Sequence, residues 1–136
     1  MRANLQDQWV FPGSTLNRVV DGDTFYADVK RTLDFGFHVK ITPTATQKFR
    51  VNGCNAAPSK TASGMGATAA LTDLLGRGPF TLASVGAYKY GDEWMAEVLL
   101  ADGRRLTDVM IEEQWSAPWD GQGAQPLPVW PRTVRS

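Results

Sequence analysis

Short runs of alternating apolar and polar residues, separated by turn-forming dipeptides, constrain the fold of this chain more than any other feature. Such runs cover residues 16–20, 24–29, 37–42, 48–52, 80–85 and 94–100. Alternation with a period of two is typical of strands that bury one face. Asp21-Gly22 and Asp102-Gly103 have the composition of tight turns, and residues 43–46 are expected to form another turn. The sequence therefore predicts mainly short β-strands.

One segment between the fourth and fifth predicted strands has a helical pattern instead. Ser63 is placed to cap this helix, Met65 and Leu74 mark one face, and Gly76 suits its C-terminal end. A shorter helix is expected over residues 107–114. Short strands with an interposed helix favour a small Greek-key barrel of the OB type.

The length of 136 residues suits one compact domain. The predicted strands and helices all fall within residues 14–121, which we expect to form that domain. Residues 1–13 are expected to be a loose tail that docks by its aromatic residues. Residues 122–136 contain three prolines and are expected to be an extended tail pinned by Trp130.

Charge and cysteine usage exclude several functions. The net charge is zero, with eight basic and five acidic residues in 1–60 and six basic and nine acidic residues in 61–136. Because strong non-specific DNA binders are basic, any contact with nucleic acid must be local. The single Cys54 excludes an intrachain disulfide, and with the single His38 it excludes a Cys/His zinc site. No apolar run is long enough to span a membrane, and the N-terminus shows no secretory signal.

Several conspicuous side chains are expected to be structural. His38 falls on the polar phase of a strand and is expected to be an exposed histidine without a catalytic role. Cys54 is expected to be a small core residue, because apolar surroundings raise the pKa of a thiol and make it inert. Phe49, Trp94 and Trp115 are expected to lie in the core.

Two segments carry candidate chemistry. Asp21-Gly22-Asp23-Thr24 places two carboxylates around a tight turn, which can supply oxygen ligands to a hard cation such as Ca²⁺. The alternative is a type I′ hairpin turn with solvated aspartates. Residues 49–58 place Arg50 on a strand, followed by a glycine, a polar oxygen ligand and a proline turn. Arg50 either binds a phosphate or forms a structural ion pair.

These segments resemble the motifs of the thermonuclease, or staphylococcal-nuclease-like, family. Residues 19–24 and 49–58 are followed by Lys89-Tyr90-Gly91, by Asp102-Gly103 and by a short helix, in the order that the family shows. The resemblance covers about residues 16–121. It implies an α+β fold that is mostly β, with a five-stranded OB-type barrel and two or three packed helices. It also implies descent from enzymes that hydrolyse DNA and RNA phosphodiesters with Ca²⁺.

The resemblance assigns roles to residues at matching positions. Asp23 matches a metal ligand, Asn55 and the backbone carbonyl of Ala56 match its co-ligands, and Asp21 matches an outer-shell aspartate. Arg50 matches the arginine that holds the phosphate. If the chain is active, Asp23, Arg50 and Asn55 are the catalytic residues. Because Asn55 replaces a carboxylate, a weakly bound Ca²⁺ is the only cofactor expected.

The chain departs from the family pattern at two positions that matter for catalysis. Ser59 stands where the family has its general-base glutamate, and Asp92, or Glu93 in another alignment of the turn, stands where it has a second arginine. Substitute cations are sought among Lys60, Lys89, Arg104 and Arg105. Tyr88 and Tyr90 either stack on a base or cover the end of the barrel. The expected ligand-binding residues are Arg50, Lys60, Tyr88, Lys89 and Tyr90.

Three functions follow as alternatives. The first is a nuclease-like protein that binds nucleic-acid or nucleotide phosphates, with phosphodiester hydrolysis weak or lost. The second is an active Ca²⁺-dependent nuclease, and the third is a protein-interaction OB module with a vestigial pocket. A single-stranded nucleic acid or a small nucleotide is the expected partner, because zero net charge disfavours long duplexes. The resemblance to stand-alone bacterial and phage members implies action in the cytoplasm.

Overall fold

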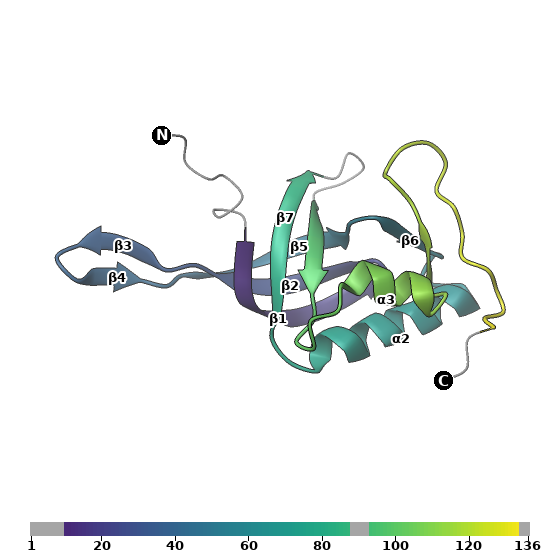
Figure 1. Ribbon diagram of the computed structural model, residues 1–136, viewed down its shortest axis with the longest axis horizontal. Coiled ribbons are helices and arrows are strands. Elements are labelled where there is room, and N and C mark those ends of the chain that lie inside the picture. Colours follow the sequence, from purple (N-terminus) through teal and green to yellow (C-terminus); the bar gives the residue numbers. More distant parts are fainter. Residues whose placement is uncertain (1–9, 88–92, 134–136) are drawn as a thin grey trace.

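Five strands close into a barrel in the computed structural model, which describes residues 10–87 and 93–133. Their order around the barrel is β1-β2-β5-β8-β7 (Figure 1). The barrel strands are β1 (Val10–Asp21), β2 (Thr24–Lys30), β5 (Thr44–Val51), β7 (Phe80–Ala87) and β8 (Trp94–Leu99). Neighbouring strands run antiparallel except β5 and β8, which pair in parallel. The expected α+β fold with a five-stranded OB-type barrel is confirmed.

The barrel core comes from the alternating residues that the sequence pattern marks. In β2, Phe25 and Ala27 are fully buried, and Phe49 and Val51 of β5 lie beside them. The ring of Phe25 packs 6.0 Å from that of Phe49, measured between centroids. Trp94, which we expected in the core, is 40% exposed because it begins β8 at the open end of the barrel.

Helix α2 (Ala62–Gly76) covers one side of the barrel (Figure 1). Its N-cap is Thr61, not the expected Ser63, and the Thr61 hydroxyl accepts a hydrogen bond from the backbone N–H of Gly64. The buried face consists mainly of Ala67, Leu71 and Leu75. Met65, which we expected on that face, is 59% exposed because it lies on the opposite side of the first turn.

Residues 37–42 do not form the expected barrel strand. Strands β3 (Leu33–Gly36) and β4 (Val39–Ile41) instead pair only with each other, and they extend beyond the barrel as a separate hairpin (Figure 1). Residues 43–46 are likewise not a turn, because β5 already begins at Thr44 and pairs with the whole length of β2. His38 is exposed as expected, but in the hairpin turn, where its φ is 66°.

Two short strands and a short helix complete the fold outside the barrel, α2 and the β3–β4 hairpin. Strand β6 (Cys54–Ala56) pairs with β9 (Ser116–Pro118), and α3 (Leu106–Glu112) lies between β8 and β9 in the chain. Cys54 is buried, and burial raises the pKa of its thiol to about 12, as an inert core residue requires. Strand β1 begins at Val10, so residues 10–13 are part of the barrel and not of a tail.

After β9 the chain forms an exposed loop and then runs back toward α2 (Figure 1). The ring of Trp130 packs 6.3 Å from that of Trp115, which is itself only partly buried against the core. The guanidinium of Arg132 lies 3.8 Å from the Trp115 ring and donates to the carbonyl of Glu113. The segment is therefore held by Arg132 as well as by Trp130. Within the described part of the chain, no helix is long and apolar enough to cross a membrane.

Candidate functional site

The turn between β1 and β2 buries one of its two aspartates. Asp23 is 4% exposed, and its carboxylate accepts hydrogen bonds from the Thr24 hydroxyl at 3.0 Å and from the Ala56 backbone N–H at 2.9 Å. Neither Gly22 nor Asp23 has a positive φ, so the turn is not type I′. The alternative of a solvated aspartate is therefore wrong for Asp23.

Gly22 is required in this turn by packing. A Cβ atom at Gly22 would overlap the Cβ of Ala67 in α2 and lie 2.9 Å from the Cβ of Ala56. Real Cβ atoms do not approach other carbons so closely. The absence of a side chain at Gly22 thus lets α2 press the turn against β6, and this brings Asp23 to the backbone of Ala56.

Arg50 reaches the same place from the neighbouring strand. The register of β2 and β5 sets Arg50 opposite Thr24, and the Nη1 atom of Arg50 lies 3.1 Å from Oδ1 of Asp23. Its Nη2 atom donates to Oδ1 of Asn55 at 2.7 Å. The guanidinium also faces the ring of Trp119 at 5.4 Å. The ion pair considered for Arg50 is therefore present, and it links both candidate segments.

This ion pair is buried, with side-chain exposure of 7% for Arg50 and 5% for Asp23. Burial raises the pKa of Asp23 above its usual value, although Arg50 and the hydrogen bonds from Ala56 and Thr24 act against that rise. A carboxylate whose pKa stays raised beside an arginine is held at a cost in free energy. We therefore expect this buried ion pair to contribute little net free energy to folding.

A pocket of about 460 Å³ opens over the pair at this end of the barrel. It brings together most of the residues that the sequence singled out. Those in its lining are Asp21, Asp23, Arg50, Asn55, Ala56, Ser59 and Lys60. Ser59 and Lys60 are exposed, while Asp23, Arg50 and Asn55 are buried. The pocket therefore has a polar, buried floor with an exposed lysine beside it.

The C-terminal segment forms another part of the pocket wall. Gln125 and Leu127 line the pocket, and the Asn55 side-chain amide donates to the carbonyl of Pro126 at 2.7 Å. Sequence reasoning missed these residues and Trp119. The proline content indicated an extended segment, but an extended segment has no periodic pattern that shows where it docks. Trp119 follows β9 directly, and only the β6–β9 pairing places it near Arg50.

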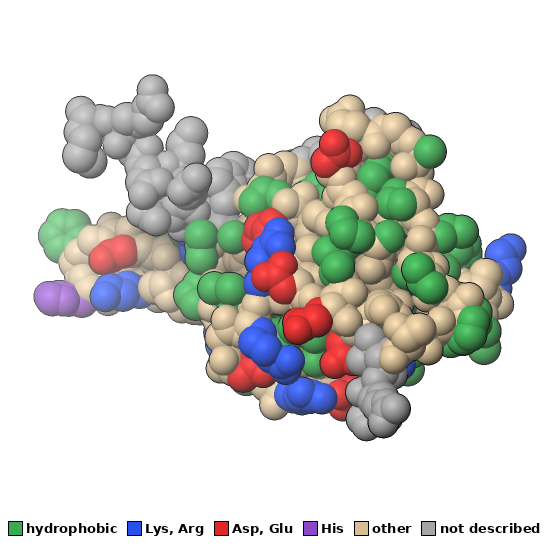
Figure 2. Space-filling model, turned by 45° about the vertical axis from the view of Figure 1, so that its right-hand side comes forward, with side chains coloured by type: hydrophobic (Ala, Val, Ile, Leu, Met, Phe, Trp, Pro, Cys, Tyr) green, Lys and Arg blue, Asp and Glu red, His purple; other side chains and the backbone are tan. Residues whose placement is uncertain are grey.

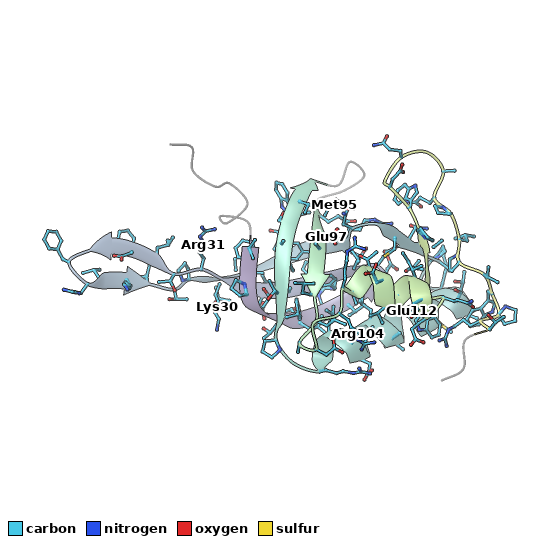
Figure 3. All side chains as sticks on the ribbon, viewed as in Figure 1. Lys30, Arg31, Met95, Glu97, Arg104 and Glu112 are labelled. Carbon is cyan, nitrogen blue, oxygen red and sulfur yellow. The ribbon has the colours of Figure 1, made fainter. Side chains whose placement is uncertain are left out.

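The remaining candidate cations are placed elsewhere or not described. Arg104 pairs with Asp102 and Arg105 with Glu97, at 2.8 and 2.7 Å. These two ion pairs lie apart from each other, as the positions of Arg104 and Glu97 in Figure 3 show. Glu93 binds Lys48 at 3.2 Å. The predictions for Tyr88, Lys89, Tyr90 and Asp92 lie outside the described residues. Among the described candidates for a substitute cation, Lys60 is the one that lines the pocket.

The expected Ca²⁺ ligands lie together but already bind one another or Arg50. No group of three or more His, Cys, Asp or Glu side chains that could hold a metal occurs within residues 10–87 and 93–133. Both carboxylate oxygens of Asp23 accept hydrogen bonds, and the Asn55 oxygen accepts from Arg50. In this arrangement a guanidinium takes the place between Asp23 and Asn55, so the residues do not fit Ca²⁺ unless Arg50 moves.

Comparisons with protein families and with curated proteins identify no relative of this chain. No protein-family model matches the chain, and no curated protein is similar to it. The resemblance to the thermonuclease family therefore rests on the ordered motifs, and the functional argument rests on the pocket itself.

Proposed function

We propose that this protein binds a phosphate group of single-stranded nucleic acid or of a nucleotide in the pocket over Arg50, with phosphodiester hydrolysis weak or absent. The observation that carries the proposal is the buried guanidinium of Arg50 at the floor of an open polar pocket. A guanidinium can hold two phosphate oxygens at once, and two hydrogen-bonded partners fix its plane here.

The cost of the buried pair supports a binding role. A buried ion pair often contributes less to stability than apolar residues of the same volume. Titratable groups that burial and charge perturb are concentrated at functional sites. Asp23 has such a perturbed pKa, and it borders the pocket. We therefore infer that Asp23 orients Arg50 and holds it ready for an anion.

Phosphate binding would use groups already in place. An incoming phosphate competes with Asp23 for the Nη1 side of Arg50, while Asn55 continues to hold Nη2. The raised pKa of Asp23 lowers the cost of this exchange, because the carboxyl group can take up a proton when it loses its partner. Lys60, exposed in the pocket lining, adds a second positive charge.

Hydrolysis of a phosphodiester needs a general base and a second cation, and the described part of the pocket lacks the family's base and its second arginine. Ser59, at the position of the family's general base, cannot take a proton from water near neutral pH without another group to activate it. No second arginine lines the pocket among the described residues. Loss of an arginine at a phosphoryl-transfer site costs roughly 10³-fold or more in rate. Binding needs neither group, because it involves no in-line water and no developing charge.

The test is a titration with a short single-stranded oligonucleotide and with a nucleoside bisphosphate. We expect Arg50→Lys to weaken both at least tenfold, because lysine cannot provide two parallel donors. Arg104→Lys is the matched control, since Arg104 is a surface arginine paired with Asp102. Equal affinity of the wild type and Arg50→Lys would contradict the proposal.

A cleavage assay separates this proposal from the active nuclease. We expect no cleavage of single-stranded DNA with Ca²⁺ above a trace. Turnover of about one per second, an ordinary value for an enzyme, would show that a group outside the described residues completes the site. Calorimetry with Ca²⁺ should show no binding at micromolar concentration, because the Arg50 guanidinium lies between Asp23 and Asn55.

The interaction module is the second candidate, and one observation favours it. The pocket wall is partly peptide, because Asn55 holds the carbonyl of Pro126 and Leu127 lines the pocket. A pocket that accepts an extended segment of its own chain can accept one from a partner. A synthetic peptide with the sequence of residues 122–133 that binds the intact protein, without any binding of nucleotides, would support this candidate over the first.

A further inference from the structure

The hairpin of β3 and β4 is an arm that the barrel does not support. Residues 32–42 leave the barrel after β2 and return to it at β5, and the two strands pair with each other alone. Figures 1 and 2 show the arm extending well beyond the barrel. Lys30 and Arg31 mark its base (Figure 3). A two-stranded hairpin without further packing is at best marginally stable in water.

The arm exposes an unusual amount of apolar surface. Its large side chains are exposed as follows: Leu33 41%, Phe35 63%, Phe37 97%, Val39 55% and Ile41 48%. Register pairs Leu33 with Ile41, and Val39 shares the face of Ile41 on β4, while Asp34 pairs with Lys40 on the other face, where the opposite charges offset one another. Contiguous apolar patches on a soluble surface mark interaction sites.

The tip presents its aromatic ring at a cost in backbone energy. Phe37 has a φ of 54° and His38 a φ of 66°. Both residues form the two-residue turn of the hairpin, which requires positive φ, but Asn and Gly usually occupy such positions. A phenylalanine there is uncommon and is worth a functional explanation. The conformation holds the Phe37 ring almost entirely in solvent.

A complementary apolar pocket lies at the base of the same arm. Its volume is about 230 Å³, and its lining includes Val29, Ala45, Gln47 and Trp94. The pair Val29–Ala45 lies next to Lys30–Thr44, the last pair of the β2–β5 ladder before the arm. A cavity of about 150 Å³ accommodates benzene, so this pocket has room for a phenyl ring. Trp94, exposed by 40%, borders it.

The arm cannot fill the pocket of its own barrel. From base to tip it spans about six residues, or roughly 20 Å at about 3.3 Å per residue. It runs away from the barrel, so its tip and the pocket lie at opposite ends of that length (Figure 1). Two copies with their arms side by side and antiparallel bring each tip to the base of the other arm.

We propose that the protein forms a symmetric dimer in which the arms cross and Phe37 of each copy inserts into the Val29–Ala45–Trp94 pocket of the other. Such an interface uses the same patch on both copies, as a two-fold axis requires. Burying the five apolar side chains of both arms removes roughly 1,000 Å² from solvent before the pocket walls are counted, close to the lower bound for a specific interface. Asp34 and Lys40 remain in water.

Sedimentation velocity of the full chain over a concentration series tests the dimer. We expect a dimer at micromolar concentration and a monomer for the double variant Phe35→Ser/Phe37→Ser, with at least a hundredfold rise in the dissociation constant. Circular dichroism should be unchanged, because both rings lie outside the core. The matched control is Leu127→Ser/Val129→Ser, which removes two similarly exposed apolar side chains elsewhere and should remain dimeric.

Disulfide trapping tests the arrangement. Cys54 is the single cysteine and is buried, so introduced cysteines report without background. A mixture of Phe37→Cys and Gln47→Cys proteins should form the mixed disulfide, and neither protein alone should cross-link efficiently.

A wild type that stays monomeric at 100 micromolar (about the upper end of the assay, where even a weak dimer would form) would overturn the proposal. Cross-linking of Phe37→Cys to itself would overturn the crossed arrangement. Binding of the monomer to lipid vesicles through the arm would assign the apolar face to a membrane surface instead.

Discussion

The two ends of the β2–β5 ladder handle burial in opposite ways. At the end where Asp23 and Arg50 lie, charged groups are buried beneath a pocket. At the other end, β3 and β4 carry five large apolar side chains into solvent. The strands between the ends bury apolar residues in the ordinary way, with Phe25 and Phe49 in the core. Neither end therefore has the distribution of polar and apolar groups that folding alone favours.

Loss of the Asp23 carboxylate should have the largest effect on stability. Asp23→Asn leaves the buried Arg50 guanidinium without its countercharge, and because arginine does not give up its proton, we expect a cost of about 3–5 kcal/mol. Arg50→Met should cost less, because burial raises the pKa of Asp23 and the carboxyl group can take up a proton when the arginine is gone. Urea unfolding of the two variants measures the difference. Equal losses would mean that protonation of Asp23 does not compensate for the loss of Arg50.

A methyl group at Gly22 should be the next largest perturbation. Gly22→Ala forces α2 away from the turn that carries Asp23, and overpacking of this kind costs about 1–3 kcal/mol. Gly76→Ala is the control, because nothing lies within 4 Å of its missing side chain and alanine is the better helix residue. A neutral Gly22→Ala with unchanged phosphate binding would show that the close approach is dispensable.

The pH dependence of stability should report Asp23 directly. Its folded pKa is raised above the unfolded value of about 3.8, so the folded protein takes up a proton before the unfolded chain does. Protonated Asp23 therefore adds its full contribution to the free energy of unfolding below about pH 3.8. This contribution is lost as pH rises through the folded pKa, and the free energy of unfolding then falls by at most about 1.4 kcal/mol per pH unit.

The comparison must be made against Asp23→Asn, because Glu97 acts in the opposite direction. Burial alone would raise the pKa of Glu97, but its hydrogen bonds from Arg105 and Asn52 lower it overall, so its contribution is lost as pH falls. Subtracting the variant from the wild type leaves Asp23 alone. A wild type that loses stability relative to Asp23→Asn on acidification would reverse the assigned direction.

The arm should contribute least to folding. Replacing residues 32–42 with Asn-Gly joins Arg31 to Pro43, whose backbone atoms already hydrogen-bond at 3.3 Å. We expect the free energy of unfolding of the monomer to change by less than about 1 kcal/mol, because no core residue is removed. Denaturation at nanomolar concentration separates this effect from any loss of dimer. A loss of several kcal/mol would show that the arm helps to fold the barrel.

The sequence was most informative where a residue's role follows from its neighbours in the chain. Alternation identified β2 and the second half of β5, and the Asp-Gly-Asp turn and Arg50 met at one pocket as the motifs implied. Alternation also marked residues 37–42, but it reports only that two faces differ and not that the apolar face is covered. The same ambiguity misplaced Trp94. Trp119 reaches Arg50 through the β6–β9 pairing, and Gln125 and Leu127 reach the pocket through the returning C-terminal segment. Neither the pairing nor the segment has a local signature in the sequence.

The parallel pairing of β5 with β8 has a consequence for how the chain folds. These strands are separated by α2 and β7, and the bond between Asn52 and Glu97 that spans them joins residues 45 positions apart. Contacts so distant in sequence must wait until the loop between them has been ordered. During synthesis from the N-terminus, the β1–β2–β5 meander with its Asp23–Arg50 pair can assemble early as an open sheet. The barrel closes only after β8 has been made, and the pocket wall is complete only when Pro126, 71 positions beyond Asn55, arrives.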